Sequence, residues 1–145
     1  MDFRREAIDK LKYYDAKRQS LQRVTDEIKR LEEDVVRIRS ASADSMSVSG
    51  SSDGREAALV NNIALRSELA RAQHATAEWL RIVEGALDSL DHEERLILER
   101  MYIRPVKGYV ENLCGELHIE KSALYTRKSA AIRRFTLALY GVTEL

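Results

Sequence analysis

The stretch NLCGELHIEKSALYTRK, residues 112–128, has the most specific residue pattern in this chain of 145 residues. Two short helices that cross at a steep angle need apolar residues at the crossing and a small residue where their backbones approach. The stretch supplies four apolar residues and one small residue for this purpose: Leu113, Leu117, Ile119, Leu124 and Cys114. The spacing therefore predicts a helix-turn-helix within residues 110–135, the motif that lays its second helix in a DNA major groove.

The second of these helices is expected to keep an apolar stripe inward, because Leu124, Ala131 and Phe135 follow one another at spacings of seven and four. Its other side mixes hydroxyl groups, which bond to base edges or phosphates, with cations that suit phosphate oxygens. The predicted DNA-binding residues are Lys121, Ser122, Tyr125, Thr126, Arg127, Lys128, Ser129, Arg133 and Arg134. The same cations also fit a plain solvated helix face, and the tyrosine fits either stacking on a sugar or base or covering the helix.

Several further positions extend this pattern upstream and downstream. They are Leu87-Asp88-Ser89-Leu90, Glu94-Arg95, Ile97-Leu98, Met101-Tyr102-Ile103, Leu113-Cys114, Leu117-His118-Ile119, Leu124, Arg127 and Ala131. In these residues the chain resembles region 4 of sigma-70-type factors, and more closely the phage and prophage regulators of the ArpU and RinA kind. The resemblance is strong over residues 87–140 and looser before them. It implies a sequence-specific transcriptional regulator, encoded by a phage or prophage, that acts on late-gene promoters and has RNA polymerase as a second candidate partner.

Three positions depart from the family pattern. His118 stands in the turn, where the family usually has a glycine because a left-handed backbone favours it. Glu120 replaces the usual Ser or Thr at the start of the second helix, so Ser122 is an alternative cap for a later start. The linker over residues 104–108 is about one residue longer than the family's turn, which shifts the first helix slightly.

The first part of the chain is predicted to be one helix over residues 1–39. One row of residues recurs every seven positions, and a second row follows three positions later. The rows are Ala7, Tyr14, Leu21, Ile28 and Val35, then Val24, Leu31 and Ile38. This is the seam of a coiled coil, and it needs a partner helix to bury it.

Residues 40–54 contain seven serines and two glycines and are predicted to form a flexible loop. A modification site or a partner contact is the alternative for this loop. Residues 55–89 are predicted to form the partner helix, with a stripe at alternating steps of four and three. The stripe is Leu65, Leu69, Ala72, Thr76, Trp79, Val83, Ala86 and Leu90. The fold class is therefore all-α: a long antiparallel coiled-coil hairpin followed by a sigma-70 region 4-like helix-turn-helix domain over residues 90–145.

Four apolar residues of the second long helix are left outside this stripe: Leu59, Ile63, Leu80 and Leu87. They indicate a second face, either for dimerisation or for docking the C-terminal domain. We expect a homodimer formed through the hairpin.

The C-terminal domain also has clear helix boundaries. Asp91 is the expected N-cap of a helix that ends before Pro105 and Gly108. Gly141 is the expected C-cap of the final helix.

The charge distribution along the chain limits the DNA affinity that we expect. The chain has 24 basic and 24 acidic residues. Residues 40–102 hold six basic and eleven acidic residues, whereas residues 103–145 hold seven basic and four acidic ones. A weakly basic end predicts modest nonspecific affinity for double-stranded DNA, so tight binding would need a dimer or a second protein.

Other function classes find little support in the sequence. Cys114 is the single cysteine, which fits a reducing cytoplasm, and the three histidines lie without metal-ligand spacing. The chain lacks a phosphate-binding glycine loop or a nucleophile motif, and it has no apolar run long enough to span a membrane. We therefore expect a cytoplasmic, non-enzymatic protein without a cofactor. The alternative function is a coiled-coil structural or adaptor protein, such as a small terminase-like packaging subunit or a factor that binds sigma or polymerase.

Overall fold

The computed structural model describes residues 1–44 and 51–142, and these residues form helices and short connections without any strand. The elements are α1 (Phe3–Asp44), α2 (Ser51–Asp88), α3 (His92–Leu98), the π-helical turn η1 (Glu99–Ile103), α4 (Tyr109–Leu117) and α5 (Lys121–Tyr140). They divide into two compact units. Unit 1 comprises Met1–Arg18 and Glu78–Leu145, and unit 2 comprises Gln19–Ala77.

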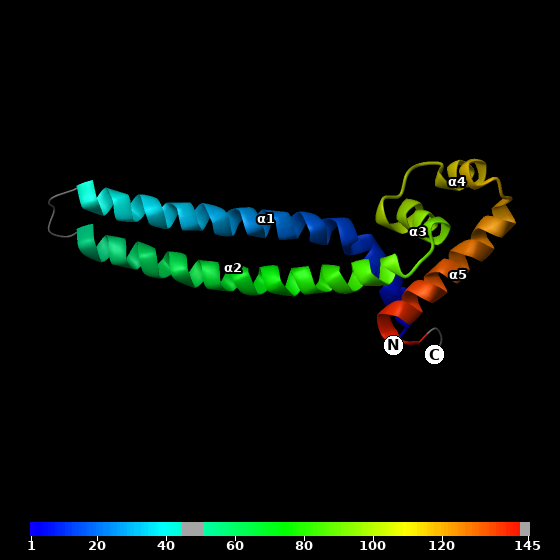
Figure 1. The fold of residues 1–145 in the computed structure, drawn as a ribbon, viewed down its shortest axis with the longest axis horizontal. Helices are drawn as coiled ribbons and strands as arrows, with labels where there is room; N and C mark the ends of the chain where they lie inside the picture. Colours follow the sequence, from blue (N-terminus) through cyan, green and yellow to red (C-terminus); the bar gives the residue numbers. More distant parts are fainter. Residues whose placement is uncertain (45–50, 143–145) are drawn as a thin grey trace. The chain divides into compact units, whose positions relative to one another are not determined.

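The two long helices run antiparallel and pack together, as the sequence predicted (Figure 1). Both are longer than predicted, because residues 40–44 and 51–54 are helical where a loop was expected. Serine is only about 0.5 kcal/mol worse than alanine inside a helix, and extending an existing helix is far easier than starting one. A serine-rich composition was therefore not enough to end either helix. The rest of the predicted loop, residues 45–50, lies outside the described part of the chain.

In unit 2 the predicted seam of α1 is confirmed. All six seam residues within this unit are buried or half-buried: Leu21, Val24, Ile28, Leu31, Val35 and Ile38. The facing stripe of α2 is only partly as predicted. Leu69 and Thr76 are half-buried, but Leu65 and Ala72 are exposed. The second inward row of α2 consists instead of Leu59, Arg66 and Gln73.

Polar side chains in the seam explain this shift. Asn62 is 7% exposed, and its Nδ2 donates to the backbone oxygen of Leu31 at 2.9 Å. The Asn62 Oδ1 accepts a hydrogen bond from Arg66 Nε at 2.7 Å. Gln73 Nε2 donates to Thr25 Oγ1 at 3.0 Å. A search for apolar periodicity passes over such residues, although a polar group with partners can lie inward at little cost.

Unit 1 has a deeper apolar core. The start of α1 contributes Ala7 and Leu11, the end of α2 contributes Val83 and Leu87, and α5 contributes Phe135, all at most 1% exposed. Leu80 and Leu87, which the sequence left for a second face, are therefore core residues of this unit. The Tyr14 hydroxyl donates to Glu84 Oε1 at 2.7 Å and links the two long helices within unit 1.

None of the helices within the described ranges is both long enough and apolar enough to cross a membrane.

Candidate nucleic-acid interface

The helix that supports the motif begins at a capping box. The Asp91 carboxylate accepts a hydrogen bond from the Glu94 N–H at 2.8 Å, and the Glu94 carboxylate accepts one from the Asp91 N–H at 3.3 Å. The bond from the Glu94 N–H lowers the pKa of Asp91, because it favours the charged carboxylate. The predicted N-cap is therefore confirmed. The helix changes to a π-helical turn at Glu99 and ends at Ile103, ahead of Pro105.

The turn between α4 and α5 spans His118, Ile119 and Glu120. His118 adopts the left-handed conformation, with φ 55° and ψ 46°. The Ile119 N–H returns to the Cys114 carbonyl oxygen at 3.2 Å, which closes the end of α4. Glu120 has an extended backbone and its side chain makes no capping hydrogen bond, so the first turn of α5 leaves its N–H groups open. His118 thus adopts a backbone conformation that usually favours glycine.

A small apolar core holds the two helices of the motif. Leu113 of α4 and Leu124 of α5 are fully buried against Ile97 and Met101 of the supporting helix. Among the partly buried residues packed on this core are Cys114, Leu117 and Ile119. The predicted crossing residues are therefore brought together, and Cys114 is a packing residue of this core. Further along α5, Ala131 and Phe135 are buried as predicted.

The first half of α5 turns a polar face to solvent. Ser122, Thr126, Ser129 and Arg133 follow one another at spacings of four, three and four, so they share one side of the helix. Ser122, Thr126 and Arg133 are exposed, and Ser129 is half-buried. The Thr126 hydroxyl donates to the Ser122 carbonyl oxygen at 3.1 Å.

Tyr125 and two lysines border this face. Tyr125 is 39% exposed, and Lys128 Nζ lies 5.0 Å from the centre of its ring. Lys121 is exposed at the first position of α5. We call Lys121, Ser122, Tyr125, Thr126, Ser129 and Arg133 the α5 outer face.

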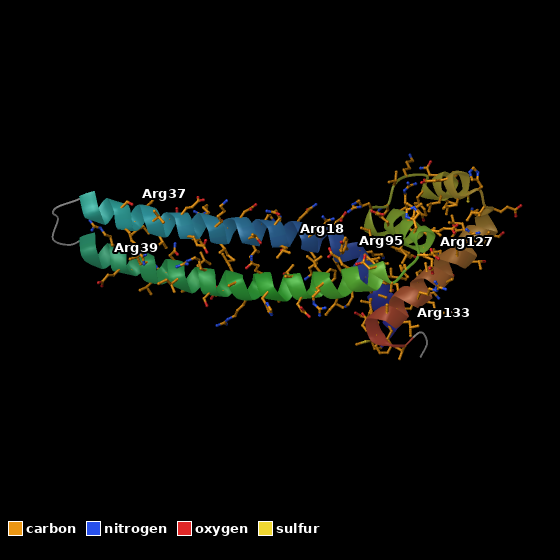
Figure 2. The ribbon with its side chains drawn as sticks, in the orientation of Figure 1. Arg18, Arg37, Arg39, Arg95, Arg127 and Arg133 are labelled. Atoms are coloured by element: carbon orange, nitrogen blue, oxygen red, sulfur yellow. The ribbon has the colours of Figure 1, made fainter. Side chains whose placement is uncertain are left out.

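Three of the predicted DNA-binding cations are not part of the α5 outer face: Lys128, which lies at the Tyr125 ring, and the arginines Arg127 and Arg134. Arg127 forms an ion pair with Glu93, and Arg134 Nη1 lies 2.9 Å from Glu94 Oε1. Figure 2 labels Arg127 and Arg133 at different positions along α5. Both acidic partners belong to α3, and the four side chains line a pocket of about 250 Å³ together with Asp91. These arginines therefore fix α5 against α3.

Sequence reasoning missed these pairings because the partners are some 34 to 40 residues apart, and nothing local in the sequence links them. The four-residue spacing of acids and bases that predicts an ion pair within one helix has no counterpart between helices. The 2.9 Å contact also explains why Glu94 remains largely buried, since its carboxylate has both a backbone and a guanidinium partner.

The motif, residues 110–135, carries only a small excess of basic side chains. Five basic and three acidic residues lie there: Lys121, Arg127, Lys128, Arg133 and Arg134, against Glu111, Glu116 and Glu120. Arg100 of η1 pairs with Glu116 of α4 at 2.6 Å. The surface therefore offers little net attraction to a phosphate backbone.

In residues 1–44 and 51–142, no group of three or more His, Cys, Asp or Glu side chains is placed to hold a metal ion. Comparisons with protein-family models, with curated proteins and with solved structures gave no match.

Proposed function

We propose that this chain is a sequence-specific DNA-binding protein that reads duplex DNA with the α5 outer face. The observation that carries the proposal is the exposure of one polar side of a helix whose other side is fixed by buried Leu124, Ala131 and Phe135. A rigid helix with a solvent-facing row of hydroxyls and one cation has the chemistry of a recognition helix.

The residues divide by the contacts they could make. Ser122, Thr126 and Ser129 are short hydroxyl side chains that suit base edges or nearby phosphates. Lys121 and Arg133 are exposed cations that suit phosphate oxygens. Arg127 and Arg134 have carboxylate partners, so we assign them to positioning α5.

The charge balance sets the expected strength of binding. Each phosphate contact changes log K by about −0.9 per tenfold rise in salt concentration. Two exposed cations on the α5 outer face imply a salt dependence of only about −2 per copy. We therefore expect weak nonspecific binding, with most of the affinity coming from base contacts and from a second copy or a second protein.

The experiment is a selection of bound sequences from random duplex DNA with the full chain at low salt, followed by titrations of an enriched and a scrambled duplex. Replacing Thr126 or Tyr125 by Ala should weaken binding to the enriched duplex by about fivefold or more, with little effect on the scrambled one. Lys121→Ala should weaken binding to both and reduce the salt slope by about one. Leu137→Ser is the matched control, because this exposed residue lies near the other end of α5.

Failure to enrich any sequence would overturn this proposal. Enrichment of the same sequence by both Thr126→Ala and Tyr125→Ala would also overturn it, because residues outside the α5 outer face would then recognise the DNA sequence.

The family resemblance supports a narrower form of the proposal. Regulators of the ArpU and RinA kind provide the basis for proposing a phage or prophage origin, action at late-gene promoters and RNA polymerase as a partner. A pull-down of purified polymerase with the full chain, with and without promoter DNA, tests that partner.

The small charge excess around the motif favours a second candidate function. In a structural or adaptor protein the same helices would bind protein partners, and DNA contact would be secondary. For a packaging subunit we would expect no enriched DNA sequence, DNA binding that does not depend on salt, and assembly of the chain into a ring.

A further inference from the structure

One flank of the two-helix seam of unit 2 combines exposed apolar side chains with a groove. Ala58, Leu65 and Ala72 recur every seven residues along α2 and are all exposed, with Leu65 at 41%. They form a second apolar row beside the inward one. Two of them, with Leu31 and Ile38 of α1, line a groove of about 420 Å³ between the two helices.

The α1 side of this groove carries a row of charges that alternate in sign. Arg30 Nε bonds to Glu27 at 3.0 Å, Arg30 Nη1 lies 3.2 Å from Asp34, and Arg37 Nη2 lies 3.5 Å from Asp34. We call Glu27, Arg30, Asp34 and Arg37 the charge ladder. Asp34 and Arg37 line the groove directly.

The charge ladder has an order of signs that lets it pair with an antiparallel copy of itself. Read from Glu27 to Arg37 its signs are minus, plus, minus, plus, and read backwards they are plus, minus, plus, minus. A two-fold axis midway along the charge ladder would place Arg30 of one copy opposite Asp34 of another, and Glu27 opposite Arg37. Every acid would then face a base.

The apolar row is centred at the same level of the hairpin. The hydrogen bond from Asn62 to the Leu31 oxygen puts the middle of the charge ladder beside Asn62, within about one helical turn of Leu65. Leu65 therefore lies close to the axis that the charges define. The two features are independent, because one is on α1 and the other on α2.

We infer that this flank of unit 2 binds a second copy of the same chain, running antiparallel, to form a four-helix bundle. A two-fold interface must be complementary to itself, and the charge ladder has this property. A pair of helices buries only one stripe of each, whereas four helices also cover the neighbouring rows, here Ala58, Leu65 and Ala72. The inference holds whether or not the chain binds DNA.

The first test measures the mass of the full chain by sedimentation equilibrium over a range of concentrations. The wild type should be dimeric, and Leu65→Glu should raise the dimer dissociation constant at least about tenfold, because it puts a charge at the centre of the interface. Ile63→Glu is the matched control. Ile63 is 57% exposed on the same helix but does not line the groove, so the dimer should persist.

The second test uses the charge ladder itself. A variant with Glu27→Lys and Asp34→Lys carries four positive charges, and one with Arg30→Glu and Arg37→Glu carries four negative charges. Each should be monomeric alone through repulsion between copies, and equal amounts of the two should form a heterodimer. Circular dichroism checks folding, because each pair lost within α1, and each like-charge pair that replaces it, should cost only about 0.2–0.5 kcal/mol of helix stability.

A wild-type chain that remains monomeric at about 100 μM would overturn the inference, because the dissociation constant would then lie well above the micromolar range. A wild-type dimer that withstands Leu65→Glu, or charge variants that do not form a heterodimer, would place the interface elsewhere and overturn it equally. A wild-type dimer without any DNA preference would leave this inference standing while removing the proposed function.

Discussion

The two units solve the problem of burying apolar surface in different ways. Unit 1 gathers helices from both ends of the chain, so residues such as Leu11, Leu98 and Phe135 are covered on all sides. In the described part of unit 2, the only buried side chains are those of Leu31 and Asn62, which are 6% and 7% exposed. The difference shows that two helices alone cover each inward side chain on one side only.

This difference decides where stability resides. Enclosed side chains gain the full transfer free energy and close packing, while half-buried ones gain a fraction of it. Unit 2 also exposes Val36, Val60 and Ile63. The comparison therefore predicts that an inward residue of the unit 2 seam contributes less to the free energy of unfolding than a core residue of unit 1.

The most severe test of this comparison substitutes the largest enclosed residue of each unit. Phe135→Ala should lower the free energy of unfolding by about 3–5 kcal/mol, because it opens a cavity in a core with no exposed side. Leu31→Ala should cost about 2 kcal/mol, at the low end for leucine, because the seam is open at its flanks. Urea denaturation followed by circular dichroism gives both values. Equal losses would mean that unit 2 is as well packed as unit 1.

The sequence was sufficient wherever a structural feature depends on local residues. Asp91 is the N-cap that the sequence predicted, and Gly141 takes the left-handed conformation that ends α5. His118 holds the predicted position in the turn. The seam of α1 also follows from spacing alone, since the spacing of seven and three is a property of one helix.

The sequence was insufficient where a feature depends on a distant partner. The ion pairs of Arg127 and Arg134 could not be predicted, because nothing near these arginines in the sequence indicates Glu93 and Glu94. The inward position of Asn62 could not be predicted either, because its partner is a backbone oxygen 31 residues away. A search for apolar periodicity does not detect inward polar residues, because their position depends on tertiary contacts.

A smaller effect is expected from the polar contact within unit 1. Burial, followed by the hydrogen bond to Glu84, raises the pKa of Tyr14 to about 12 from about 10. Tyr14→Phe removes the 2.7 Å hydrogen bond to Glu84 and should cost about 1 kcal/mol at neutral pH. The rest of the ring keeps its place in the core, so the loss should stay well below that of Phe135→Ala.

The sign of the pH dependence follows from the raised pKa. Between pH 10 and about 12 the unfolded chain has lost the Tyr14 proton while the folded chain keeps it, so stability falls as pH rises through this window. Below pH 10 both states hold the proton and Tyr14 contributes no slope. Urea denaturation of wild type and Tyr14→Phe at matched pH values isolates the contribution of Tyr14 from those of all other groups. Parallel curves from pH 9 to 12 would show that Tyr14 titrates normally.

The smallest effect, and the one that most sharpens the comparison, concerns Asn62. Asn62→Leu removes a desolvated amide from the seam and adds apolar contact, while Arg66 is exposed enough to be hydrated once its partner is lost. Stability should change by less than about 1 kcal/mol, in either direction. Asn62→Ala loses the same hydrogen bonds without the new contact and should cost about 1 kcal/mol more than the leucine variant. If both variants instead lose well over 1 kcal/mol relative to the wild type, the polar layer itself stabilises unit 2. The two units would then differ in the kind of contact that holds them and not in how strongly they are held.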